Sequence, residues 1–243
     1  MKYHYYNKCK SQFLLKHIAF TLAEVLITLG IIGIVAAMTI PTLITKYQKQ
    51  VTINQLKVAY QIFSEAIQNA KLDQDSLDIG LRIPSETMKS GDPSRAISAL
   101  FIDPYIKGAE QYTAKDHIYT YTPQKKAQSI YAMYSKSEDN YKPMCMPKGF
   151  CYWVINHSGN YTWLVVDLNG PKGPNVFGRD LFMFDIAKHY VLGVGRLYID
   201  TVAPFDGNVN SLCSKSSDSR SNGRTCASKI INDGWKIDSD YPW

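Results

Sequence analysis

In this 243-residue chain, the first segment lacks acidic residues and the second lacks basic ones. Residues 1–19 contain no aspartate or glutamate but carry four lysines, and residues 20–44 contain no lysine or arginine. A basic stretch followed by an apolar one is typical of a targeting segment. Removing the four leader lysines lowers the formal net charge from +6 to +2. Because that remainder is nearly balanced, its charge gives little support to nucleic-acid binding, which needs a basic face, and we expect no nucleic-acid partner.

Several motifs of enzymes and metal proteins are also absent. The sequence has no Walker A loop, no dinucleotide-binding fingerprint and no CxxC zinc pair. His117, His157 and His189 have no acid or cysteine at catalytic spacing, which favours ordinary surface or core histidines. We therefore expect no catalytic residue and no enzyme activity.

Cysteine is scarce but unevenly placed. Of five cysteines, only Cys9 lies in the basic leader, and the other four are Cys145, Cys151, Cys213 and Cys226. Disulfides in an oxidising compartment would close two short loops, 145–151 and 213–226. Four cysteines allow three connectivities, and buried free thiols are the alternative. Metal binding is disfavoured, since no histidine lies at ligand spacing beside them.

Residues 20–44 form an apolar run with a single charged residue, Glu24. A helix of 25 residues reaches about 37 Å, which exceeds a hydrocarbon core of about 30 Å. A secretory signal cut near "VAAM" (35–38) fits less well, because its core would be shorter and free of acid. A carboxylate inside a bilayer costs about 2.5–3.5 kcal/mol, so Glu24 needs a partner. Cleavage after Ala19 would supply the new α-ammonium group of Phe20, about one turn away.

The segment "KHIAFTLAEVLITLGIIGIVAAMTIPTLI" resembles the N-terminus of type IV prepilins and of type II secretion pseudopilins. The resemblance implies cleavage between Ala19 and Phe20 by a prepilin peptidase, which also N-methylates Phe20, and an assembly role for Glu24. Ala19 departs from the glycine that is usual before the cut. The implied partners are this peptidase and methyltransferase, other pilin or pseudopilin subunits, an inner-membrane assembly platform and membrane lipid. The alternatives are a plain membrane anchor, and an anchored exported enzyme or ligand-binding protein.

The resemblance also implies a location and a division of the chain. The basic leader stays in the cytoplasm, a single span crosses the inner membrane, and the globular part lies outside the cytoplasm before it enters a filament. We expect a cleaved leader over 1–19, a transmembrane and filament-core helix over 20–44, an amphipathic continuation over 45–72 and an exported domain over 73–243.

The rest of the chain predicts an α+β fold. Apolar residues at spacings of three or four, from Leu56 through Phe63 to Ala70, extend the helix to about Leu72, with Pro41 tolerated as a kink. A short helix is expected over 93–101, and two-residue alternation predicts strands at 117–122, 129–135, 151–157, 160–167 and 181–186, with a hairpin turn at 158–159. The result is a pilin-like fold, with a long N-terminal helix packed on a C-terminal antiparallel sheet.

Two later stretches resemble pilin-like proteins of this type. One is "DLNGPKGPNVFGRDLFMF" (167–184), and the other is "CASKIINDGWKIDSDYPW" (226–243), where the resemblance implies a bond from Cys226 to Cys213. In the first stretch Asp167, Asn169, Asn175 and Asp180 offer oxygen ligands for Ca²⁺, which major pseudopilins bind in the same part of the fold. The alternative is a turn held by Asx side chains.

Overall fold

The fold is given by a computed structural model of the chain. It describes residues 21–74, 83, 93–112, 143–147, 149–157, 161–170, 172, 175–190, 196–205, 212–214 and 223–243. Ala19, Phe20 and His117 lie outside these residues, as do the strands expected at 117–122 and 129–135 and the turn at 158–159. The chain divides into two units, residues 1–47 and 48–243, which are described separately.

Helix α1 extends over Leu22–Asp73 and contains Pro41. Its end lies one residue beyond the expected Leu72. The first unit contributes the apolar part of the helix, and none of residues 21–47 is buried. Pro41 has no N–H to donate to the Ala37 carbonyl oxygen four residues earlier, so the helix lacks one backbone hydrogen bond there. Beyond the proline, the Thr45 hydroxyl donates a hydrogen bond of 2.9 Å to the Pro41 carbonyl oxygen. This helix is long and apolar enough to cross a membrane.

In the second unit, six antiparallel strands form one sheet in the order β1-β2-β3-β4-β5-β6. The strands are β1 Glu110–Gln111, β2 Met144–Cys145, β3 Cys151–His157, β4 Tyr161–Asp167, β5 Leu181–Tyr190 and β6 Arg196–Pro204. The bounds of β3 equal those expected from the sequence, whereas β5 continues beyond its expected end at residue 186 to Tyr190. Short β1 and β2 and the edge strand β6 were not expected. Pro204 at the end of β6 is compatible with an edge, where a missing N–H breaks no central ladder.

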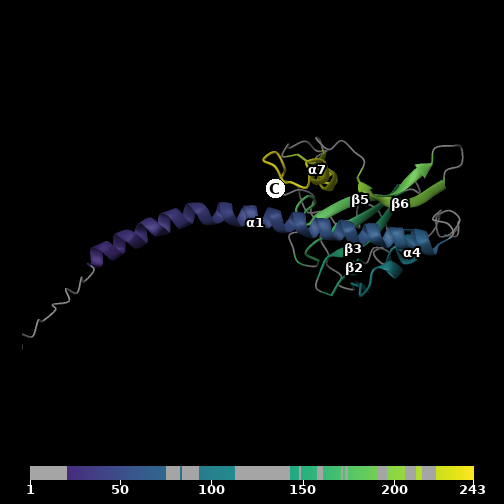
Figure 1. Ribbon diagram of the computed structural model, residues 1–243, viewed down its shortest axis with the longest axis horizontal. Helices are drawn as coiled ribbons and strands as arrows, with labels where there is room; N and C mark the ends of the chain where they lie inside the picture. The colour runs from purple at the N-terminus through teal and green to yellow at the C-terminus, as the bar shows by residue number, and fades with distance from the viewer. Residues whose placement is uncertain are drawn as a thin grey trace, which may run out of the picture. The chain divides into compact units, whose positions relative to one another are not determined.

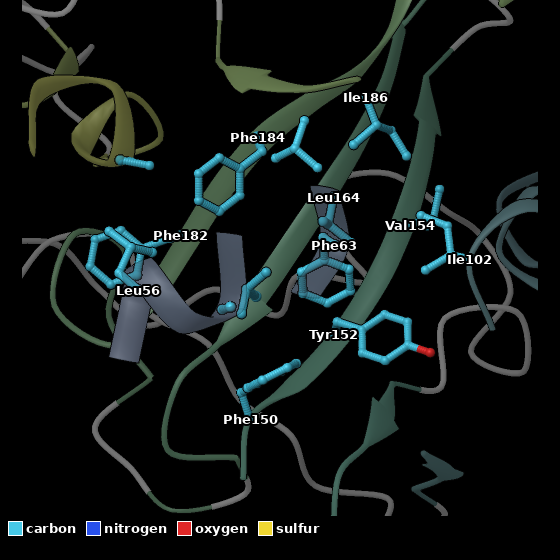
Figure 2. Close-up of a cluster of buried hydrophobic side chains, with 14 of the residues drawn as sticks. Leu56, Phe63, Ile102, Phe150, Tyr152, Val154, Leu164, Phe182, Phe184 and Ile186 are labelled. Carbon is cyan, nitrogen blue, oxygen red and sulfur yellow. The ribbon is translucent and has the colours of Figure 1, made fainter. Parts of the chain in front are cut away.

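The part of α1 that belongs to the second unit packs across one face of this sheet (Figure 1). Leu56, Phe63 and Ile67 are buried at helical spacing, as the sequence predicts, whereas Tyr60 is only partly buried. Phe63 packs edge-on against Tyr152 of β3, with 5.0 Å between ring centroids, among other sheet side chains (Figure 2). One helix face and one sheet face thus share a hydrophobic core, and the fold is α+β.

The opposite face of the central strands is buried as well. Trp153, Val165 and Met183 belong to a second apolar cluster, while their neighbours in β3, β4 and β5 point to α1. Because successive side chains of a strand alternate between faces, burial on both sides makes these strands apolar almost throughout.

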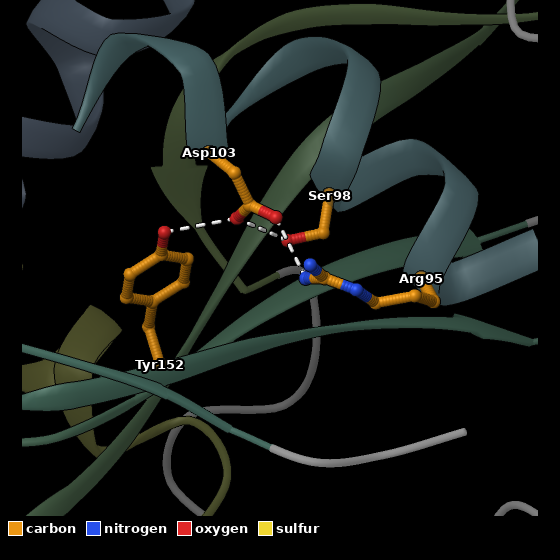
Figure 3. Close-up of polar contacts among 4 residues, drawn as sticks. All are labelled: Arg95, Ser98, Asp103 and Tyr152. Atoms are coloured by element: carbon orange, nitrogen blue, oxygen red, sulfur yellow. Dashed lines mark hydrogen bonds and ion pairs between the residues drawn. The ribbon is translucent and has the colours of Figure 1, made fainter. Parts of the chain in front are cut away.

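A partly buried polar cluster attaches the short helices to the sheet (Figure 3). Helix α4 (Pro93–Phe101) is followed by the 3₁₀ turn η1 (Asp103–Tyr105). The Asp103 carboxylate accepts hydrogen bonds from Ser98 at 2.8 Å and Tyr152 at 2.9 Å, and pairs with Arg95 at 2.6 Å. Burial, and secondarily the Asp103 charge, raise the pKa of the Tyr152 hydroxyl, which therefore stays a hydrogen-bond donor. With three donors on one carboxylate, this cluster anchors α4 and η1 to β3.

Candidate functional site

The first candidate site is the N-terminal end of α1, where an acid precedes a long apolar surface. Large apolar side chains of the first unit are exposed, including Leu22, Ile31, Ile40 and Leu43. An apolar helix surface of this length cannot remain in water and has to be covered by lipid or by other helices. Glu24 is the only acid in its first turn.

Glu24 closes a reciprocal cap with Thr21, the residue just before the helix. The Glu24 backbone N–H donates to the Thr21 hydroxyl oxygen at 3.2 Å, while Glu24 Oε2 accepts from the Thr21 N–H and from the Thr21 hydroxyl, each at 2.8 Å. This is a capping box, which satisfies donors that a helix N-terminus leaves open. A carboxylate there also interacts favourably with the helix dipole.

The capping box gives Glu24 a role within its own chain that the sequence analysis did not consider. The signal was present, because Thr21-Leu22-Ala23-Glu24 follows the pattern of a Ser or Thr three residues before an acid. The geometry also directs the carboxylate back towards the start of the chain. Its oxygen lies 2.8 Å from the Thr21 nitrogen, which is one residue from the position of the expected cleavage.

The second candidate site is the loop between β4 and β5, where the structure brings four expected residues together. Asp180 is its centre. Its Oδ2 accepts from the Asn175 N–H at 2.9 Å and from the Asn169 side-chain amide at 3.0 Å, and its Oδ1 accepts from the Val176 N–H. Asn175 has a φ of 52°, in the left-handed region that asparagine tolerates. The Asp180 carboxylate thus holds the turn, as in the Asx alternative.

Asp167 ends β4 and is fully buried. Its Oδ1 accepts from the Asn169 N–H at 3.2 Å, but its Oδ2 is buried without a hydrogen-bond partner among the described residues. Burial, and then the charge of Asp180, raise the pKa of the Asp167 carboxyl to about 8. An unsatisfied buried carboxylate oxygen beside a second carboxylate is unfavourable unless a proton or a cation neutralises it.

The fit of this loop to Ca²⁺ follows from its oxygens. Ca²⁺ takes carboxylate, amide and backbone oxygens, and the loop offers all three kinds, with the open oxygen of Asp167 as the strongest candidate ligand. Within the described part of the chain, no three His, Cys, Asp or Glu side chains gather at a metal-binding distance. Carboxylates alone therefore do not supply all the Ca²⁺ ligands, and Asn side-chain oxygens and backbone carbonyl oxygens would have to complete the coordination.

Two disulfides support the second unit. Cys145 of β2 is bonded to Cys151 of β3, and Cys213 is bonded to Cys226 at the start of α7 (Cys226–Asn232). The second bond lies against the loop of Asp180. A Cβ added at Gly178 would lie 2.7 Å from Cys226 Sγ, and the buried Tyr241 hydroxyl donates to the Gly178 carbonyl oxygen. The loop, the disulfide and the C-terminal segment are therefore packed as one group.

These features define an α+β domain, stabilised by disulfides, on an apolar N-terminal helix. Residues 42–243 match the model of a family described as a family of unknown function, DUF6613. The chain belongs to that family. The match begins after most of the apolar part of α1, so it does not include Thr21 or Glu24. No curated protein and no solved structure matches the chain.

Proposed function

We propose that this protein is a pilin-like structural subunit of a type II secretion pseudopilus or a type IV pilus-like filament. The observation that carries the proposal is the start of α1, where one carboxylate, folded back towards the chain start, precedes a long exposed apolar surface. The two disulfides favour a domain outside the cytoplasm, and the apolar helix a membrane location. In this proposal lipid covers the helix before assembly, and neighbouring helices cover it in the filament.

The role of Glu24 follows from its charge and from its capping bonds. Prepilin peptidase would cut between Ala19 and Phe20 and methylate the new Phe20 amine. That cationic amine would then lie within reach of a Glu24 carboxylate, in the same chain or in a neighbouring subunit. Pairing the two charges lowers the cost of placing each in an apolar environment, and pairing between subunits favours one register of packing.

Substitutions at Glu24 separate the charge from the cap. Glu24→Gln removes the charge but keeps a side-chain oxygen that can accept from the Thr21 N–H. Glu24→Ala removes both, and Thr21→Ala removes only the hydroxyl part of the cap. We expect filament assembly, measured by shearing and by subunit crosslinking, to fail in E24Q and E24A and to persist in T21A. Normal filaments in E24Q would refute the charge pairing, with membrane insertion measured in every variant as the control.

The processing step is tested directly by mass spectrometry of the membrane-derived protein. The expected chain starts at N-methylated Phe20. An intact Met1 would refute the filament proposal and favour a membrane-anchored exported enzyme or ligand-binding protein. A start near Met38 would also refute the filament proposal, because most of the apolar helix would have been removed.

We also propose that the loop between β4 and β5 binds Ca²⁺ through Asp167. The proposal is supported by the fully buried Oδ2 of Asp167, which has no hydrogen-bond partner among the described residues, and by the amide and carbonyl oxygens nearby. Calcium that binds only the folded state stabilises it by RT ln(1 + [Ca²⁺]/Kd), and so raises the unfolding temperature as its concentration increases. We expect the full chain in detergent to unfold at a higher temperature in calcium than in EDTA, with magnesium as the control. Equal temperatures in calcium and EDTA would refute the site.

A further inference from the structure

Three side chains from distant parts of the sequence form a cationic aromatic surface in the second unit. Lys49 Nζ lies 5.9 Å from the ring centroid of Trp243, and the guanidinium carbon of Arg179 lies 5.6 Å from the same centroid. All three side chains are partly exposed. Among the described residues, no carboxylate forms an ion pair with Lys49 or Arg179. We call Lys49, Arg179 and Trp243 the Trp243 surface.

The position of Lys49 along α1 indicates what the Trp243 surface can contact. Lys49 follows Ile44, the last residue of the apolar run, by five residues of α1. At about 1.5 Å per residue, a helix places Lys49 about 7 Å beyond the hydrocarbon boundary, which is the depth of lipid headgroups. Tryptophan and lysine are both favoured at that depth. Lys46 and Tyr47, which come just before Lys49, add further residues of the same two kinds.

The chain offers a matched contact that should lie farther from the membrane. Lys57 Nζ lies 5.6 Å from the ring centroid of Trp235, a geometry similar to that of Lys49 and Trp243. Lys57 is eight residues farther along α1, or about 12 Å, which exceeds a Debye length of about 8 Å at physiological salt. Charge attraction to a membrane should therefore act on Lys49 and only weakly on Lys57.

We propose that the Trp243 surface binds the anionic headgroups of the membrane that holds α1. Lys49 and Arg179 supply positive charge with no carboxylate paired to them within the described residues, and Trp243 supplies the amphipathic ring suited to the interface. The inference depends on the membrane anchoring in the proposed function. It adds a second contact with the bilayer, which would keep the domain on the membrane surface until assembly.

The test uses the full chain in lipid vesicles that carry a nitroxide quencher at the headgroup. One set of vesicles is phosphatidylcholine, and the other contains about one third phosphatidylglycerol. The signal of Trp243 is the quenching in the wild type minus that in Trp243→Phe, because this subtraction removes the contributions of the buried Trp153 and Trp163 and of the partly buried Trp235. We expect stronger quenching of Trp243 in the anionic vesicles and a loss of that difference in high salt.

Charge substitutions then identify the cations responsible. A cation near an anionic surface contributes about fivefold to binding, so Lys49→Gln and Arg179→Gln should each weaken docking of the domain about fivefold. Lys57→Gln, the matched control, should leave Trp243 quenching unchanged. Near-ultraviolet circular dichroism and intact disulfides verify that each variant is folded.

Each remaining result overturns the inference in an identifiable way. A chain that does not float with the vesicles removes the membrane anchor, and both the proposed function and this inference fail. A chain that floats with Trp243 unquenched, or equally quenched in neutral and anionic vesicles, refutes this inference alone. Quenching that falls as the protein-to-lipid ratio rises would show that a second copy of the chain covers the Trp243 surface, which refutes the lipid headgroup as its partner.

Discussion

Replacing Gly178 by alanine tests the packing between the loop and the second disulfide. Gly178 has a φ of 85°, and a Cβ there would lie 2.7 Å from Cys226 Sγ and 3.3 Å from the Tyr241 hydroxyl oxygen. The left-handed backbone costs alanine about 1–2 kcal/mol. Overpacking against the disulfide adds about 1–3 kcal/mol, because the nearest atom is a disulfide sulfur, which cannot move away as a flexible side-chain end could. We expect a total loss of about 2–5 kcal/mol.

Gly234→Ala is the matched control for that substitution. Gly234 has a φ of 74°, but nothing lies within 4 Å of the Cβ that would be added. Its cost should therefore be the backbone cost alone, about 1–2 kcal/mol. The difference between the two variants measures the overpacking separately from the conformational effect.

The assay is urea unfolding of the full chain in detergent, followed by tryptophan fluorescence. A second measurement repeats Gly178→Ala in a chain that carries Cys213→Ala and Cys226→Ala. Removing the sulfur should recover most of the overpacking cost, so the substitutions should be non-additive by about 1–3 kcal/mol. Equal losses for G178A and G234A, or strict additivity with the cysteine substitutions, would refute the proposed contact.

Two further predictions concern the carboxylates of Asp167, which is buried, and Asp103, which is partly buried. Burial beside Asp180 raises the pKa of the Asp167 carboxyl from 3.8 to about 8, so without calcium its contribution to stability is lost as pH rises through that interval. At pH 7, Asp167→Asn should therefore stabilise the EDTA-treated chain by up to roughly 4 kcal/mol, as measured by thermal unfolding. The same substitution should abolish the stabilisation by calcium. A variant that still responds to calcium would exclude Asp167 as a ligand. Tyr152→Phe removes one of three donors to Asp103 and should cost about 1–2 kcal/mol in urea unfolding, with an unchanged value excluding a stabilising role for that hydrogen bond.

A strand could be predicted from the sequence when its own residues are enough to indicate it. Strand β3 was predicted with its full bounds, because a short segment rich in aromatic and β-branched residues is enough to indicate a strand. Strands β1 and β2 have two residues each, and their pairing partners rather than their own pattern make them strands. β6 was missed because its apolar and polar residues do not alternate regularly, and its pairing with β5 includes an irregularity between Asp185 and Ala187.

The candidate sites likewise combine features that a short segment of sequence shows with features that only the folded chain shows. The carboxylate of Glu24 and its place before an apolar run were visible at once, and even the cap with Thr21 follows a local pattern. For the loop, the sequence named Asp167, Asn169, Asn175 and Asp180 together but did not assign their roles. Only the folded loop made Asp180 an acceptor of backbone N–H groups and left a buried oxygen of Asp167 open.

The sequence by itself determined the features that one short segment encodes. These are an apolar helix with an acid at its start, amphipathic periodicity after Pro41, and short loops that cysteines can close. The tertiary structure decided which distant residues meet. Trp243 lies against Lys49 and Arg179, and Tyr241 against Gly178, because the C-terminal segment packs between α1 and the β4–β5 loop. A periodic pattern specifies which face of an element is apolar, whereas its partner is selected by the packing of the whole domain.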